Sequence, residues 1–243
     1  MIPMLSFFKF IAFLVCVFAV NKLSHSLKKD PRGELWQYFY KMFVVSVGVF
    51  FLFSILPLLY FFGGKEGSLR IINIITWLAI FLIFVASAYI SHIVFTLTYF
   101  KKIRKIAFWM IVLMGLVEFI LALFQMEPAL VLTYNLGDLT FITWGPSISP
   151  SSIFILNLII IISFTVLSAV LFFYRGASLP EHRLRVRSFM FGGTMIGFSL
   201  ATLGLFGFGS LFELTFSADL IHGLGSVGSM AFLLGGIYYG QKE

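Results

Sequence analysis

The Lys and Arg residues of this chain lie almost entirely in every second gap between long apolar segments. Seven such segments follow one another, at about residues 3–23, 37–62, 69–99, 105–125, 151–174, 187–208 and 217–239. The first, third and fifth gaps are basic, whereas the fourth and sixth contain no Lys or Arg. Cytoplasmic loops of membrane proteins carry the excess of Lys and Arg. The pattern therefore predicts a seven-helix membrane bundle with its N-terminus outside and its C-terminus inside.

The composition excludes a water-soluble domain. Hydrophobic residues make up 60% of the chain and charged residues only 11%, with a mean hydropathy of +1.04. Continuous apolar runs of about 20 residues favour spanning helices over the alternating strands of a barrel. The net charge of +7 does not indicate nucleic acid, because the basic residues flank the apolar segments. We expect one all-α domain over residues 1–243, surrounded by a lipid bilayer.

The first apolar segment has some features of a secretory signal. Lys9 precedes an apolar run, and Val17-Phe18-Ala19 could serve as a cleavage site. Cleavage would leave the basic stretch 22–41 outside, against the charge rule, so we expect an uncleaved helix. Cys16 is the single cysteine, which excludes a disulfide within the chain.

The largest loop joins the fourth and fifth segments at about residues 126–150. Two β-prone runs, 131–134 and 139–144, surround an Asn-Leu-Gly-Asp sequence, which predicts a small outer β-hairpin. Trp144 suits the headgroup region of a bilayer. The hairpin is either a connector on the membrane surface or a lid over an outward-facing pocket, since long loops are often functional.

Polar residues within the apolar segments indicate where a ligand would bind, because their burial in a membrane is costly and usually functional. Glu118 lies near the middle of the fourth segment, and Gln125 shares its face two turns later. Asn157 and His222 lie near the outer ends of the fifth and seventh segments. We expect these four side chains and Trp144 to form a ligand site in the outer half. The structural alternative is a neutral Glu118 that is hydrogen-bonded between helices.

No cofactor or enzymatic activity is expected. His92 and His222 are placed at different depths, whereas two haem ligands face each other across one plane. Retinal needs a Lys in the last helix, and 217–239 contains none. The chain has no HExxH or CxxC metal motif and no nucleotide-binding, kinase or hydrolase motif.

The last two apolar segments are rich in small residues. Gly193 and Gly197, and likewise Gly236 and Gly240, are four residues apart. This spacing lets helix backbones approach closely. It predicts tight packing of the sixth segment against the seventh, with a dimer face as the alternative.

Three further features occur together: N-out topology, the long 126–150 loop, and the basic Arg183-Leu184-Arg185-Val186-Arg187 before the sixth segment. In these, and in the short acidic gap before the seventh segment, the chain resembles the seven-helix N-terminal membrane sensor domains of bacterial histidine kinases. The resemblance implies a sensor or receptor for a small molecule or lipid in a prokaryotic plasma membrane. Such sensors continue into an output domain, whereas these residues end just past the last segment. We therefore expect a protein partner or homo-oligomer to supply the output, unless the chain is a fragment.

Two other functions remain open. A small transporter or channel would use Glu118 as a proton or cation site. An accessory subunit of a larger membrane complex would need no soluble output of its own.

Overall fold

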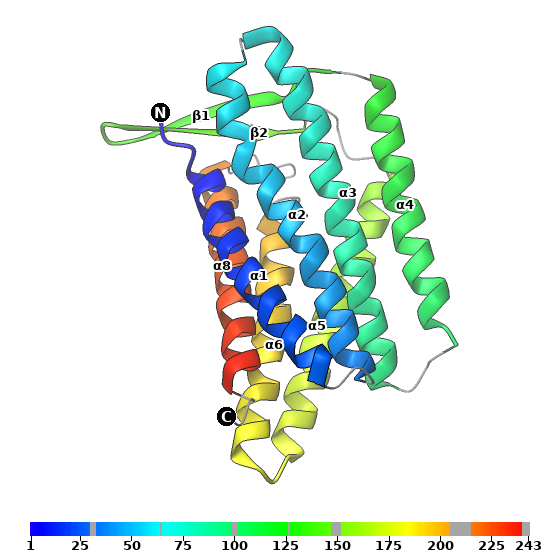
Figure 1. The fold of residues 1–243 in the computed structure, drawn as a ribbon. Coiled ribbons are helices and arrows are strands. Elements are labelled where there is room, and N and C mark those ends of the chain that lie inside the picture. Colours follow the sequence, from blue (N-terminus) through cyan, green and yellow to red (C-terminus); the bar gives the residue numbers. More distant parts are fainter. Residues whose placement is uncertain are drawn as a thin grey trace.

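Within the residues that the structure describes, seven long helices run side by side and a two-stranded hairpin crosses one end of them (Figure 1). The computed structural model describes residues 1–29, 33–63, 65–98, 102–125, 127–146, 152–204 and 215–239. The helices are α1 (Met4–Lys29), α2 (Glu34–Phe62), α3 (Lys65–Leu97), α4 (Arg104–Gln125), α5 (Ser152–Ser178), α6 (His182–Leu203) and α8 (Thr215–Tyr239). All seven are long and apolar enough to cross a membrane, which confirms the predicted helical architecture.

Most helices extend beyond the apolar segments that predicted them, and α1 and α6 do so by the largest margins. α1 continues to Lys29, and α6 begins at His182, so the basic residues before the sixth segment are helical. Lys and Arg are good helix formers, and their backbone can remain helical after the apolar run ends. Hydropathy therefore located the membrane-spanning part of each helix but not its full length.

The helices form a ring with one member outside it. α1 packs against α2 and α8, α3 packs against α2 and α5, and α6 packs against α5 and α8. The order α1-α2-α3-α5-α6-α8 therefore closes on itself. α4 packs against α3 and α5 and lies outside this ring.

The hairpin consists of β1 (Leu130–Leu136) and β2 (Leu139–Gly145), which pair antiparallel. Gly137 in the two-residue turn has a φ of 60°, a conformation that glycine adopts without a Cβ clash. The N-terminus pairs with β2, since Ile2 N donates to Thr140 O at 2.9 Å and Ile142 N donates to Ile2 O at 3.1 Å. The N-terminus and the hairpin lie at the same end of the bundle, which we call the hairpin end (Figure 1).

Small residues bring α6 and α8 close together. A Cβ atom on Gly197 would lie 2.8 Å from the Cα of Ser229, and one on Gly225 would lie 2.8 Å from the backbone N of Ala201. A Cβ on Gly193 or Gly236 would lie 3.1 Å from a phenylalanine ring of the facing helix. The stripe of small residues that the sequence singled out thus lies between α6 and α8, while Gly240 is outside the described residues.

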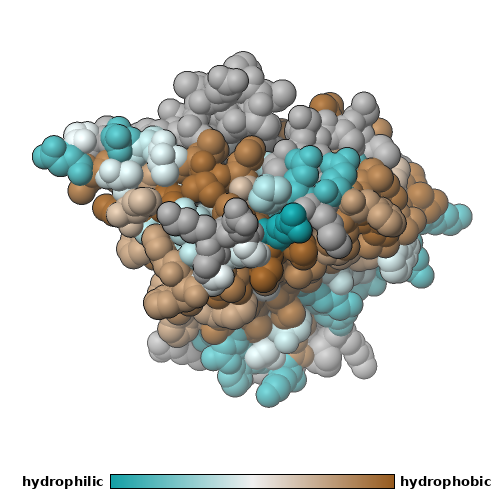
Figure 2. All heavy atoms as spheres, turned by 90° about the horizontal axis from the view of Figure 1, so that it is seen from above, coloured by the Kyte–Doolittle hydropathy of each residue, from teal (hydrophilic) through white to brown (hydrophobic). Residues whose placement is uncertain are grey.

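Large apolar side chains cover the sides of the bundle. α4 shows this most clearly, with Ile106, Trp109, Leu113 and Phe124 all more than half exposed. Seen from the hairpin end, apolar surface covers much of the visible molecule and a hydrophilic group marks the hairpin tip (Figure 2). A soluble monomer does not leave such apolar faces open to water, whereas lipid covers them at no cost.

Candidate ligand-binding site

The most unusual side chain in the structure is a buried lysine. Lys9, in the second turn of α1, is only 1% exposed. Its Nζ donates a hydrogen bond to Ser226 Oγ of α8 at 2.7 Å. The same nitrogen lies over two rings of α2, 5.0 Å from the centroid of Phe50 and 5.7 Å from that of Phe53. An ionisable group in this position is expensive to bury and indicates a functional site.

Ser226 connects Lys9 to His222, one turn earlier on α8. Ser226 Oγ accepts from Lys9 and donates to the His222 carbonyl at 2.7 Å. His222 Nδ1 lies 2.6 Å from the carbonyl oxygen of Ala201 on α6. A carbonyl can only accept, so Nδ1 carries the hydrogen of this bond. His222 Nε2 is buried and has no hydrogen-bond partner among the described residues.

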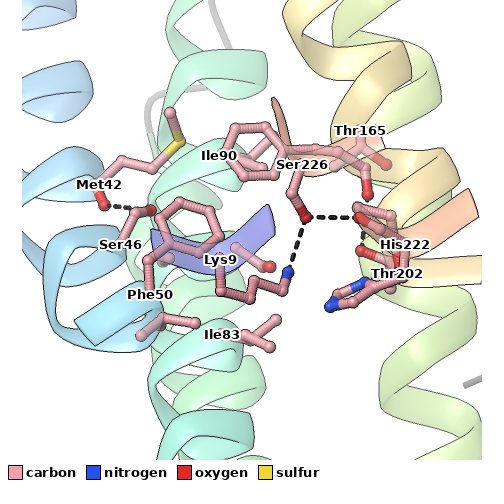
Figure 3. Close-up of a pocket in the computed structure, with 15 residues that line it drawn as sticks. Lys9, Met42, Ser46, Phe50, Ile83, Ile90, Thr165, Thr202, His222 and Ser226 are labelled. Carbon is pink, nitrogen blue, oxygen red and sulfur yellow. Dashed lines mark hydrogen bonds between the residues drawn. The ribbon is translucent and has the colours of Figure 1, made fainter. Parts of the chain in front are cut away.

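These polar groups open onto a cavity inside the helix ring. The centre of a water molecule can occupy about 40 Å³ of this cavity. Its wall is formed by the six ring helices α1, α2, α3, α5, α6 and α8. Figure 3 shows the Lys9 amine directed at Ser226 and beside His222, with Phe50 and Ile83 around the lysine side chain. At about 10–15 Å³ for each water centre, the space is large enough for roughly three water molecules.

The hairpin is fastened to the start of α8, one turn from His222. The Tyr134 hydroxyl donates to Asp219 Oδ2 at 3.1 Å, and the Thr143 hydroxyl also bonds this carboxylate. Burial, together with the adjacent Asp219 carboxylate, raises the pKa of Tyr134 above its ordinary value. Trp144 packs on Tyr60 of α2 with ring centroids 5.3 Å apart. The hairpin therefore contacts both α2 and α8, two of the helices around the cavity.

The base of the hairpin is also attached to α3. Asn73 Nδ2 donates to the Glu127 carbonyl at 2.8 Å, and Ala129 N donates to Leu69 O at 3.0 Å. With the pairing of Ile2, these bonds hold the hairpin across the end of the ring.

The structure does not bring the five predicted site residues into one cavity. Of the five, His222 lines the cavity described above. Glu118 is on the buried face of α4, and Asn157 of α5 donates to the Ile111 carbonyl of α4 at 3.3 Å. Gln125 is exposed at the end of α4, and Trp144 is in the hairpin. The separation follows from the position of α4 outside the ring, which directs its buried face to α3 and α5 rather than to the interior.

Lys9 was missed as a site residue because its position near the N-terminus suited a signal sequence. Two signals were nevertheless present. A charged residue interrupts an apolar run in the first predicted span, and Asp219, His222 and Ser226 repeat at i, i+3 and i+7 along one face of the last helix. Neither signal reveals that the first and last helices adjoin.

His92 lies near the other end of the bundle. Its ring stacks on Tyr38 with centroids 4.6 Å apart and an interplanar angle of 9°. Its Nδ1 is buried without a hydrogen-bond partner among the described residues. Among all the residues that the structure describes, no cluster of three His, Cys, Asp or Glu side chains could hold a metal ion.

Comparisons with protein-family models and with curated proteins find no match for this chain.

Proposed function

We propose that this chain is a membrane receptor that binds a small molecule in the cavity lined by Lys9 and His222. In this proposal the N-terminus and the hairpin are outside, the C-terminus is inside a prokaryotic plasma membrane, and a protein partner or second copy provides the output. The observation that carries the proposal is the buried Lys9 amine at the wall of a cavity. The alternation of basic gaps supports the orientation.

Retention of a buried amine is difficult to explain by stability alone. Moving a charged group from water into a protein interior costs several kcal/mol. On membrane-insertion scales, a charged residue at the centre of a helix costs about 3 kcal/mol. An apolar residue of the same length would avoid that cost. Ser226 and two phenylalanine rings compensate for part of it. A ligand that bonds the same amine would compensate for the remaining cost of burial, and the amine would hold that ligand in the cavity.

The helix packing offers a route from the cavity to the other end of the bundle. The ligand would touch α1, α2, α6 and α8, and the close contact between α6 and α8 continues from Gly225 to Gly236. Interfaces of small residues permit two alternative packings with little loss of contact area. A ligand that fits one packing better than the other would shift the equilibrium between them.

Native mass spectrometry of gently solubilised protein tests this proposal. We expect the wild-type chain to retain a small molecule or lipid at fixed stoichiometry and Lys9→Met to lose it. Lys28→Met, an exposed position on the same helix, is the matched control and should retain it. A ligand-free wild-type chain, or equal retention in Lys9→Met, would overturn the proposal.

A transporter is the second candidate, because Lys9, Asp219, His222 and Glu118 are all buried ionisable groups in one bundle. It would move protons or small ions past these groups. Proton-coupled or cation-coupled flux in liposomes that is abolished by Glu118→Gln or Lys9→Met would favour transport. Binding without flux in either variant or in the wild-type chain would favour the receptor.

A further inference from the structure

The Lys9 amine has hydrogen-bonding capacity that the described residues do not use. An ammonium group has three N–H donors, and the bond to Ser226 uses one of them. The faces of Phe50 and Phe53 offer weaker attraction. Within the described residues, the one ion pair closer than 4 Å joins Arg104 to Glu34, so Lys9 has no carboxylate in direct contact there.

Asp219 does not fill this role. Its carboxylate accepts hydrogen bonds from Tyr134 and Thr143 in the hairpin, and it is not among the side chains that line the cavity. It lies close enough to act on Lys9 only through space. An amine at the cavity wall, with N–H donors to spare and no contacting carboxylate among the described residues, is suited to an acidic ligand.

His222 adds an acceptor beside this donor. Because Nδ1 carries the hydrogen bonded to Ala201, Nε2 in the neutral ring is a bare acceptor, and it has no partner among the described residues. A carboxyl group can accept from an amine with one oxygen and, when protonated, donate with the other. The acid carries one proton into the site. If Nε2 takes it, the carboxylate accepts hydrogen bonds from both Nε2 and the Lys9 amine; if the Lys9 amine takes it, the carboxylate is bonded by Lys9 alone.

The rest of the wall is mostly apolar, with Ser46, Ser87, Thr165 and Thr202 among its lining residues, and it limits the size of the ligand. Val49, Phe50, Ile83, Ile90 and Phe198 contribute to it. Space for roughly three waters corresponds to about 90 Å³ of liquid, at about 30 Å³ per water. This suits an acid of roughly two to four carbons. A doubly charged phosphate or sulfate would leave its second charge uncompensated among these side chains.

We propose that the cavity binds a short monocarboxylic acid, with its carboxyl group between Lys9 and His222 and its carbon chain against Phe50, Ile83 and Phe198. The inference rests on the proposed receptor function and specifies the class of ligand. It requires no metal and no bond-forming chemistry.

Isothermal titration of the solubilised wild-type chain, in a buffer with a bulky sulfonate anion, compares propionate, propionamide, chloride and decanoate. We expect one-to-one binding of propionate, and at least tenfold weaker binding of the other three. The amide lacks the charge, chloride lacks the carbon chain, and decanoate exceeds the cavity. Equal affinity for propionamide or chloride, or tighter binding of decanoate, would overturn the assignment.

Variants locate the binding site. Lys9→Met should weaken propionate binding at least tenfold, and Lys28→Met should leave it unchanged. Unchanged affinity in Lys9→Met would place propionate elsewhere and refute the inference. Should Lys9→Met not fold, as judged by circular dichroism and gel filtration, the wild-type ligand series still decides the question.

The same proteins separate this inference from the receptor proposal. If native mass spectrometry shows that Lys9→Met loses a bound molecule that is not a short acid, the receptor proposal stands and the ligand class is wrong. If neither propionate nor any retained molecule depends on Lys9, both fail.

Discussion

The Tyr134 hydroxyl lies 3.1 Å from Asp219 Oδ2 and joins the hairpin to the start of the last helix. The two residues are 85 positions apart in the chain. Asp219 is one helical turn before His222, which lines the cavity. The bond therefore connects the hairpin directly to the helix that holds His222 and Ser226 of the candidate site.

Tyr134→Phe removes this bond and should loosen the hairpin. A hydrogen bond to a buried charged group contributes about 1.5–3 kcal/mol, so we expect lower thermal stability and faster amide hydrogen exchange over residues 130–145. Tyr174→Phe, at a side chain that is 76% exposed, is the control. Unchanged exchange over the hairpin in Tyr134→Phe would show that the bond does not hold it.

Tyr134 should also titrate above the ordinary range of a tyrosine. Because its folded-state pKa is raised above the ordinary value of about 10, its contribution to stability is complete below pH 10. That contribution is lost as the pH rises through the folded-state value. Phenolate absorbance near 295 nm should show a late component that is smaller in Tyr134→Phe. Equal titration curves for the two proteins would contradict a part-buried Tyr134 hydroxyl bonded to Asp219.

Gly197→Ala should destabilise the bundle. The new Cβ would lie 2.8 Å from the Cα of Ser229, so α6 and α8 must separate. Overpacking of this kind costs about 1–3 kcal/mol. Gly228→Ala is a matched control on α8, because its Cβ would meet nothing within 4 Å. We expect the melting temperature to fall for Gly197→Ala and to stay the same or rise for Gly228→Ala; equal values would argue against close packing.

Lys9→Met should be at least as stable as the ligand-free wild-type chain. Replacing a buried charge with an apolar side chain of similar length is often neutral or stabilising by about 1–4 kcal/mol. Lys9→Ala should be less stable than either, because it leaves a void among Phe50 and its neighbours. Thermal unfolding of the three proteins in one detergent measures both effects. A large loss of stability in Lys9→Met would indicate that the amine serves the fold.

The orientation can be measured with single cysteines in a Cys16→Ser background. A cysteine at Asp138, exposed at the hairpin tip, should react with a membrane-impermeant maleimide added to intact cells. A cysteine at Lys102, exposed between α3 and α4, should react only after the membrane is opened. The reverse result would invert the proposed topology.

Local signals were enough to predict the elements of this fold. Apolar runs located all seven helices, and the β-prone runs around Gly137 located the hairpin. Each depends on residues that are close in sequence, where hydropathy and turn preference act directly. The ends of α1 and α6 were placed less well, because helices continue past the membrane through basic residues that favour helix.

The neighbours of each helix could not be predicted in the same way. An apolar face fits lipid and another helix equally well, so hydropathy does not show that α4 lies outside the ring. That one feature separates Glu118 and Asn157 from His222. It also explains why Lys9, whose partner Ser226 is 217 positions away, was not connected with the last helix.

The bond between Lys9 and Ser226 has a consequence for the order of assembly. α1 is synthesised well before α8, so the amine exists long before its partner does. Until then, water or lipid headgroups must solvate it at the membrane surface. The arrival of α8 between α1 and α6 is the step that removes this charge from water, which makes closure of the ring the last event in building the site.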